Sequence, residues 1–377
     1  MHFYVNLHRA EFLVWNLHSL LVAKIFVHIL EKSYLCKNFF AMLTEIKIEN
    51  ITAFDSLDIK LSKGINVFIG ANGTGKTHLM KLLYAAMLVA DVSSKKTLDQ
   101  ILQTIFLPDS LGRLVKRSLG RGSGSFSVYR QDDGDIVRSI RYELTSLSKS
   151  QIINHRIWSK KQSYNTVYIP VKDMLANSPG FKSLYEKREL YFESIYADIV
   201  DLALLPPLKG HASKEKTILL DLIQQIIDGK VIKKAEKFYL KNKQGNLEFT
   251  LLAEGYRKLG LLYSLIQNGS ISSGSILFWD EPEANLNPKL TQQLVSIILE
   301  LQRMGTQIFI ATHDYVFLKE LELSKQKQDA VMYHSLYKEC EEIKSQSVEN
   351  LNEISNNAIN DTFDSLVAKT LGFEWED

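Results

Sequence analysis

Gly70-Ala71-Asn72-Gly73-Thr74-Gly75-Lys76-Thr77 decides the fold, because it matches the phosphate-binding pattern G-x-x-x-x-G-K-[ST] at every position. The preceding run, 65–69, is rich in β-branched and aromatic residues and predicts a short buried strand. The following segment, 76–88, has the apolar spacing of a helix. A glycine-rich loop between a strand and a helix N-terminus is the setting that this motif requires.

The residue types of this loop predict its chemistry. Glycines let the backbone N–H groups point inward, and the helix dipole adds partial positive charge at the same place. Lys76 is expected to reach the β- and γ-phosphates of a nucleoside triphosphate, and the Thr77 hydroxyl to contact Mg²⁺. The residues expected to bind the nucleotide are Gly70, Asn72, Gly73, Thr74, Gly75, Lys76 and Thr77. The alternative is a glycine-rich turn with an accidental lysine, which the acidic motif downstream makes less attractive.

A second apolar run, 275–279, ends at the adjacent carboxylates Asp280 and Glu281. In open α/β sheets, ligands bind at the carboxyl ends of the strands. We therefore expect Asp280 to contact Mg²⁺, directly or through water, and Glu281 to orient or deprotonate the attacking water. A strand followed by a solvated acidic turn is the alternative interpretation.

A third apolar strand is predicted at 307–312 and ends at His313. Before it, Asn287 and Pro288 have the residue types of a helix N-cap and a first helical position. A histidine at such a strand end can reach the γ-phosphate, so we assign His313 a catalytic role rather than a structural one.

These motifs, taken in order, resemble the ABC-type ATPase head of SMC-like and RecF-like proteins. They also resemble the AAA-type ATPases related to the overcoming-lysogenization-defect family. The resemblance covers roughly residues 43–90 and 165–320. It implies an α/β P-loop NTPase fold with an antiparallel β lobe and an inserted helical lid. It also implies a homodimer whose two heads sandwich ATP and Mg²⁺, with 285–288 as the dimer-contact loop.

The chain departs from the family pattern in its signature turn, which corresponds to 252–259. In the family this turn opens a helix and binds the γ-phosphate held by the partner subunit. Gly255 is expected to fill that nucleotide-binding role. Ala253, however, stands at the usual serine position, which removes a hydroxyl contact, and Arg257 and Lys258 are the candidates to compensate.

The glutamine loop of the family is also altered. The strand predicted at 167–170 resembles its lead-in, but no glutamine follows. Whether Lys172 or Asp173 takes its place stays open.

The remaining segments suggest how the chain is organised. Residues 122–145 predict a hairpin with its turn at 132–135, and 236–252 repeat that shape. Residues 181–235 are expected to be helical, with one apolar stripe along 181–199. We divide the chain into an N-terminal extension (1–41), the head (42–340, with a helical insertion at about 175–235) and an acidic tail (341–377), which is too short for the nuclease domain of the overcoming-lysogenization-defect proteins.

Composition and charge restrict the possible partners and the cellular compartment. The net charge of +2 argues against a generally basic nucleic-acid coat, although basic clusters occur at 113–121 and 230–243. Cys36 and Cys340 are the only cysteines and form no C-x-x-C pair, which favours a reducing cytoplasm. Within residues 1–41, the stretch Phe12–Leu30 is strongly apolar but interrupted by Lys24, so no membrane span is expected there. For residues 1–41, an over-long predicted start before Met42 is the first interpretation, a docking or partner helix the second and a membrane anchor the third.

Three functions are compatible with these features. The first is an ATPase that regulates a partner, an effector from a neighbouring gene, in phage defence. The second is a DNA-repair or DNA-clamping ATPase of the RecF or SMC type, which would bind DNA. The third is a nucleotide-locked scaffold without turnover, suggested by Ala253.

Overall fold

The computed structural model describes residues 42–117, 120–131, 137–155, 164–187, 190–210, 213–356 and 358–371. The N-terminal segment 1–41 and the predicted turn at 132–135 lie outside these residues. Within the described ranges, none of the helices has the length and apolar character needed to cross a membrane.

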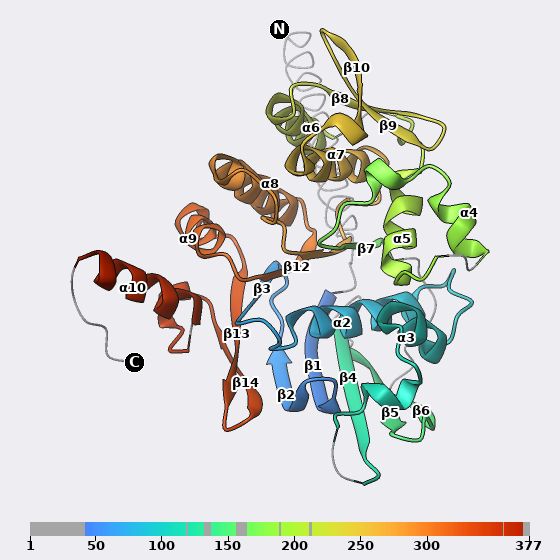
Figure 1. Ribbon diagram of the computed structural model, residues 1–377, viewed down its shortest axis with the longest axis vertical. Coiled ribbons are helices and arrows are strands. Elements are labelled where there is room, and N and C mark those ends of the chain that lie inside the picture. Colours follow the sequence, from blue (N-terminus) through green and yellow to red (C-terminus); the bar gives the residue numbers. More distant parts are fainter. Residues whose placement is uncertain are drawn as a thin grey trace, which may run out of the picture. The chain divides into compact units, whose positions relative to one another are not determined.

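A six-stranded sheet carries the phosphate loop (Figure 1). Its order is β14-β13-β3-β12-β11-β7, and every neighbouring pair is parallel except β13 and β14. Strands β3, β11 and β12 are buried along their whole length, as expected for parallel strands covered on both faces. The strands are β3 (Ile65–Ile69), β7 (Thr166–Ile169), β11 (Ile276–Asp280), β12 (Gln307–Thr312), β13 (Val331–Glu339) and β14 (Glu342–Val348).

Alternate residues of these strands enter two separate cores, because side chains of a strand point to opposite faces. On one face, Phe278 and Phe309 stack at a centroid distance of 4.8 Å and share a core with α2 (Lys76–Ala90) and α3 (Leu98–Phe106). The other face, with Trp279 and Ile310, packs against the opposite layer of helices (Figure 1). That layer contains α7 (Glu254–Gln267), α8 (Thr291–Arg303) and α9 (Tyr315–Ser324).

The predicted antiparallel lobe is a five-stranded sheet of order β2-β1-β4-β5-β6. The hairpin expected at 122–145 is confirmed, with Val128 of β4 opposite Ile140 of β5. The apolar residues of the lobe share the core that also contains α2. The strands are β1 (Met42–Ile51), β2 (Phe54–Lys60), β4 (Ser123–Gln131), β5 (Val137–Thr145) and β6 (Ser150–His155).

The prediction that residues 181–235 are helical was wrong in two places. The stripe along 181–199 divides into α4 (Phe181–Glu186) and α5 (Ser194–Ala203), and Tyr191 between them is 79% exposed. After α6 (Lys214–Ile226) the chain forms β8 (Lys230–Lys234). With β9 (Lys237–Asn242) and β10 (Gly245–Glu248), this strand builds a separate three-stranded sheet.

The segment after 340 begins within the sheet. Strand β14 pairs with β13 along its length, from Glu342 opposite Glu339 to Val348 opposite Tyr333. Helix α10 (Ala358–Thr370) follows, and its Phe363 ring stacks on Tyr315 of α9 at 4.0 Å. The predicted tail thus starts as an edge strand, while the division of the chain into extension, head and tail stays a prediction.

Candidate nucleotide-binding site

The phosphate loop lies where β3 passes into α2, as the sequence predicts. Two glycines in it are required by their surroundings. Gly70 (φ 149°) has no room for a Cβ, which would lie 2.2 Å from the carbonyl oxygen of Leu336. At Gly75 (φ 89°), a Cβ would lie 2.5 Å from the Phe54 ring. The loop is therefore fixed by a β13 carbonyl on one side and by an aromatic ring of the lobe on the other.

Lys76 turns back over this loop. Its ammonium group donates to the carbonyl oxygens of Gly70 (2.7 Å) and Ala71 (2.9 Å), and the residue is 8% exposed. Burial lowers the pKa of Lys76, while the carboxylates of Asp280, Glu281 and Glu283 oppose that shift. A desolvated cation held inside a glycine loop is a favourable partner for a phosphate oxygen.

Asp280, the last residue of β11, lies beside the start of α2. The Thr77 hydroxyl donates to its Oδ2 atom at 2.9 Å, and the Tyr168 hydroxyl donates to the same atom at 3.4 Å. Burial raises the pKa of Asp280 to about 6, and the nearby charge of Glu281 adds to this, whereas both hydroxyls oppose it. The predicted metal ligands Thr77 and Asp280 are thus in direct contact, although they are 203 positions apart in the sequence.

Glu281 and His313 face each other across the ends of β11 and β12. The Nδ1 atom of His313 lies 3.1 Å from the Oε1 atom of Glu281. Both side chains are accessible to solvent, since that of His313 is 50% exposed and that of Glu281 is 26% exposed. Glu281 has a left-handed backbone (φ 48°), and its N–H donates to the Ala311 carbonyl at 2.9 Å. This sparsely populated conformation turns the carboxylate away from the buried strand and toward His313.

A second carboxylate in the turn after β11, Glu283, is buried and stabilises this turn through a hydrogen bond. The Thr312 hydroxyl donates to its Oε1 atom at 2.6 Å, and burial raises the pKa of Glu283 to about 7. The buried Lys258 ammonium donates to the carbonyl oxygens of Glu281 (3.2 Å) and Ala284 (2.7 Å). Lys258 of α7 therefore holds the backbone of the acidic turn.

The signature turn packs against the loop that follows the acidic turn. Helix α7 begins after Ala253, the N-cap residue, which makes no side-chain capping hydrogen bond. A Cβ on Gly255 would lie 2.9 Å from Leu286 and 3.2 Å from the carbonyl oxygen of Asn285, so glycine permits close packing on the predicted dimer-contact loop. The close contacts of Gly255 are with this loop rather than with the phosphate loop.

Neither cation proposed to replace the missing serine is free to do so. Lys258 is engaged by the acidic turn, as described above. The Nε atom of Arg257 lies 2.8 Å from Oδ2 of Asp173, and its Nη1 atom donates to the Leu252 carbonyl. Asp173, whose side chain is 1% exposed, therefore contacts the signature helix, leaving Lys172 as the exposed residue of the altered glutamine loop.

A cavity of about 630 Å³ opens beside the phosphate loop. Its walls include Gly70–Thr74, Ala53 between β1 and β2, Tyr337 of β13, and Lys116. Lys116 forms an ion pair with Asp55. The cavity has the size of a small-molecule site and is in the right place for the remainder of a nucleotide. It also shows that Lys116, part of the first basic cluster, faces this cavity.

Thr77 contacts Asp280 and Glu281 contacts His313, four residues that the sequence motifs singled out, but several supporting residues were not predicted. These are Tyr168, Glu283 and Thr312, while Lys258 was proposed for a different role. Tyr168 was inside a predicted strand, and Glu283 and Thr312 were inside recognised motifs, yet only their neighbours in space reveal their contacts.

The charge of Asp280 gives a test of this geometry. A carboxyl whose pKa is raised by folding, here from 3.8 to about 6, stabilises the fold below its unfolded pKa. That contribution is lost as the pH rises through about 6. Asp280→Asn mimics the protonated form and keeps an acceptor for Thr77. We expect the nucleotide-free variant to be about 2–3 kcal/mol more stable than the parent at pH 8, with the difference vanishing below about pH 4.

Urea unfolding at the two pH values measures this difference. A variant that is no more stable than the parent at pH 8 would contradict the assignment of a costly buried charge at Asp280.

Comparisons with known proteins identify the family and the fold of this chain. A family described as "AAA domain, putative AbiEii toxin, Type IV TA system" matches residues 116–319, more than half of the chain. That span includes Asp280, Glu281 and His313, while the phosphate loop precedes it.

A DNA replication and repair protein RecF from Cytophaga hutchinsonii is 23% identical over 191 residues, which is 50% of this chain. The chain spans less than half, 45%, of that relative.

Two solved structures share the fold. One is an SMC head bound to the C-terminal winged-helix domain of ScpA, with a TM-score of 0.54 and 13% identity over 82% of this chain and 98% of that one. The other is an SMC head with an extended coiled coil, bound to the C-terminal domain of ScpA from Pyrococcus furiosus. Its TM-score is 0.51, with 11% identity over 88% of this chain and 100% of that one. The predicted P-loop fold of ABC type is confirmed.

Proposed function

Because the chain belongs to the AAA-domain family that matches residues 116–319, and because it has the fold of an SMC-like ATPase head, we propose that it binds ATP with Mg²⁺, closes as a dimer around the nucleotide and hydrolyses it. The observation that carries this proposal is the convergence at one sheet edge. Asp280 and Glu281 lie at the end of β11 and His313 follows the end of β12. Thr77 lies in the first turn of α2, next to Lys76, and contacts Asp280, while His313 contacts Glu281.

Each side chain has a separate task in this proposal. Lys76 exchanges its contacts with loop carbonyls for contacts with phosphate oxygens. Glu281 holds the attacking water and accepts its proton, and His313 orients Glu281 and contacts the γ-phosphate. Glu283 and Lys258 keep the acidic turn in position without touching the substrate.

The residues present also fit Mg²⁺. The Thr77 hydroxyl and the buried Asp280 carboxylate are in contact, and both are oxygen ligands of the kind that Mg²⁺ prefers. Burial raises the pKa of Asp280, and a bound cation would favour its charged form. When bound, the ion would neutralise phosphate charge during transfer. Thr77 and Asp280 would hold it.

The dimeric form rests on the signature turn. The start of α7 and the loop 284–286 form one packed unit, since Gly255 lies against Asn285 and Leu286. In this proposal the unit faces the nucleotide of a second copy, and Gly255 completes that copy's site. Mg²⁺-dependent ATP turnover by the full chain, measured with and without duplex DNA, tests the enzymatic part. Absence of any ATP binding would refute it.

Ala253 offers a gain-of-function prediction. Serine at this N-cap position supplies an acceptor for the first turn of α7, which has no side-chain cap. We expect Ala253→Ser to stabilise the protein by about 1 kcal/mol. We also expect it to raise ATP turnover several-fold, since the hydroxyl adds a γ-phosphate contact across the dimer. Urea unfolding and steady-state turnover measure the two effects separately. Ala253→Gly is the control, because it caps the helix without a hydroxyl; an equal rise in turnover there would contradict the hydroxyl contact.

For the biological role, we favour regulation of a partner protein in phage defence, supported by the toxin–antitoxin description of the family. Copurification with an effector encoded nearby would support it, and full biological activity of the protein alone would exclude it.

A DNA-repair or DNA-clamping role is the second candidate, supported by the similarity to RecF. It predicts stimulation of turnover by duplex DNA, with a steep dependence on salt. The test variant is Arg113→Glu combined with Arg117→Glu, both exposed. Lys116 is left intact, because it faces the nucleotide cavity. Stimulation that survives this change would exclude the cluster as the DNA contact.

A further inference from the structure

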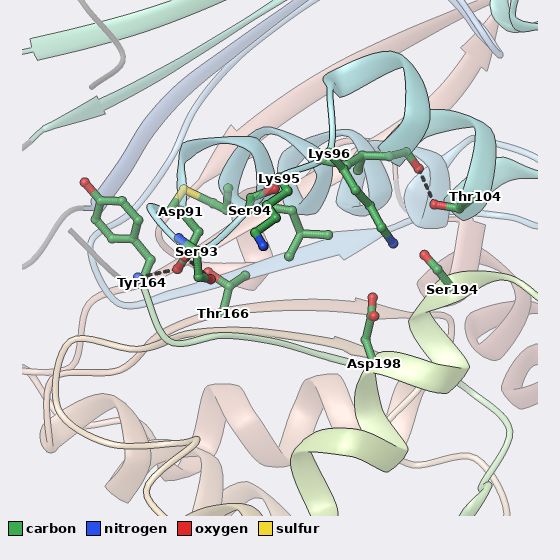
Figure 2. Close-up of a pocket in the computed structure, with 13 residues that line it drawn as sticks. Asp91, Ser93, Ser94, Lys95, Lys96, Thr104, Tyr164, Thr166, Ser194 and Asp198 are labelled. Atoms are coloured by element: carbon green, nitrogen blue, oxygen red, sulfur yellow. Dashed lines mark hydrogen bonds between the residues drawn. The ribbon is translucent and has the colours of Figure 1, made fainter. Parts of the chain in front are cut away.

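A second cavity, of about 400 Å³, lies at the other end of α2 (Figure 2). Its walls come from the last turns of α2 and the turn after it, from α3, from the start of β7 and from α5. From Lys76 to Met87 the helix rises roughly 16 Å. The cavity is therefore distinct from the phosphate loop, and its volume lies within the range of small-molecule sites.

One side of this cavity is built to attract an anion. The ammonium ends of Lys95 and Lys96 point into it, and that of Lys96 lies on the side of the Thr104 and Ser194 hydroxyls (Figure 2). Within the part of the chain that the structure describes, neither lysine takes part in a hydrogen bond or ion pair. Asp91, in the same wall, accepts hydrogen bonds from the backbone N–H groups of Ser93 (2.7 Å) and Tyr164 (2.8 Å).

The rest of the cavity suits an uncharged group with donors and an apolar face. The Thr166 Oγ1 atom is buried there and has no hydrogen-bond partner among the described residues. Asp198, which points toward the lysines, offers a carboxylate acceptor (Figure 2). Burial raises the pKa of Asp198 to about 6, and the charge of Lys96 opposes the rise. Met87, Leu88 and Ile101 supply the apolar wall.

Buried side chains join this cavity to the nucleotide site. The Tyr84 hydroxyl donates to Asp198 at 3.2 Å, and the Tyr84 ring meets the Tyr168 ring edge-on at 5.3 Å. Tyr168 donates to Asp280, and both tyrosines are 1% exposed.

A second connection runs through α2 itself. The ammonium of Lys81, a buried residue whose charge lowers the pKa of Asp280, pairs with Glu193 at 2.5 Å. Glu193 directly precedes Ser194, which lines the cavity. A ligand that moves α5 would therefore disturb contacts on both routes to Asp280.

We propose that this cavity binds a phosphomonoester of nucleoside size, a nucleoside monophosphate, and that its occupancy changes the affinity of the phosphate loop for ATP. The phosphate contacts Lys95 and Lys96, the ribose hydroxyls contact Asp198 and Thr166, and the base lies along the apolar wall. The effect is reciprocal, because ATP must change the affinity of the second ligand by the same factor. This inference rests on the proposed ATP binding but adds a regulatory ligand to it.

Binding is tested by calorimetric titration of the full chain with AMP, GMP, ribose 5-phosphate and inorganic phosphate. One arm uses Lys76→Ala, which disables the phosphate loop. We expect AMP or GMP to bind Lys76→Ala with the affinity of the parent protein. Lys95→Ala combined with Lys96→Ala should weaken binding at least tenfold. Lys60→Ala combined with Lys63→Ala, which removes two exposed lysines elsewhere, should leave it unchanged.

Three results would overturn the assignment. They are no binding of either nucleotide, binding lost in Lys76→Ala but kept in the Lys95/Lys96 variant, and inorganic phosphate or ribose 5-phosphate binding as tightly as the nucleotides. ATP binding by the same Lys95/Lys96 variant separates the two proposals. If the parent and this variant bind ATP but no monophosphate, only the regulatory site fails. If neither binds ATP, the proposed function fails.

The coupling has its own test. Tyr84→Phe keeps the ring against Tyr168 but removes the hydroxyl that contacts Asp198. In the parent protein, saturating monophosphate should change the dissociation constant of ATP at least threefold. In Tyr84→Phe, which leaves only the Lys81–Glu193 route, that ratio should move closer to one, while the monophosphate still binds. An unchanged ratio would overturn the tyrosine route.

Discussion

Glu281→Gln lowers ATP turnover by about 100- to 1,000-fold and leaves ATP binding intact. The variant keeps the size and left-handed backbone position of the side chain but removes its capacity to accept a proton, a loss typically worth 10²–10⁴ in rate. The Nδ1 atom of His313, now 3.1 Å from the carboxylate oxygen, still finds an amide oxygen. Steady-state phosphate release and equilibrium ATP binding measure the two quantities on the same sample.

The matched control is Glu283→Gln, two residues further along. Its carboxyl is buried, accepts from Thr312 at 2.6 Å and supports the turn without facing His313. A glutamine oxygen also accepts from Thr312, so turnover should fall by less than about fivefold, far short of the general-base loss. Equal losses in the two variants would mean that negative charge in the turn matters, rather than a base at Glu281. Unchanged turnover in Glu281→Gln would exclude Glu281 as the base, whereas no turnover in either protein, with ATP still bound, would favour a non-catalytic scaffold.

Lys76→Ala weakens ATP binding by about 10- to 100-fold. A hydrogen bond to a charged group contributes about 1.5–3 kcal/mol, and about 1.4 kcal/mol corresponds to a tenfold change in affinity. Lys76 is also the one member of the predicted nucleotide-binding set that carries a positive charge. The fold should survive, because burial lowers the pKa of Lys76 and its ammonium is already costly to desolvate.

Lys76→Met distinguishes charge from packing, since it keeps a long side chain without the ammonium. We expect it to bind ATP as weakly as Lys76→Ala when titrated under the same conditions. Wild-type affinity in either variant would show that the nucleotide does not lie in the phosphate loop.

Individual strands and helices were predictable because each is encoded by a short continuous stretch of sequence. The strand at Ile65–Ile69, the helix from Lys76 and the strand at Gln307–Thr312 are each encoded by a continuous apolar pattern next to a motif. Since parallel strands end at one sheet edge, the meeting of Thr77 with Asp280 followed from the fold class.

The errors concern contacts between distant segments. Tyr191 fits a helical stripe by spacing, yet it is 79% exposed because α4 and α5 are separate helices. Residues 230–234 lie within the range predicted to be helical, but the segment is a strand that pairs with β9. Asp173 and Arg257 each looked like a substitute for a missing family residue, whereas they pair with each other. No single-sequence pattern encodes such a pairing.

The central claim is that ATP closes two copies of this chain around the nucleotide, and the mass of Glu281→Gln with and without Mg²⁺ and ATP tests it most directly. The chain has a mass of 43.1 kDa. Light scattering on the eluting protein should give this mass without nucleotide and about twice it with ATP, because blocked hydrolysis traps the closed state. Gly255→Glu, which places a bulky charge against Leu286, should stay monomeric while still binding ATP. A single-chain mass for Glu281→Gln saturated with ATP would contradict the account.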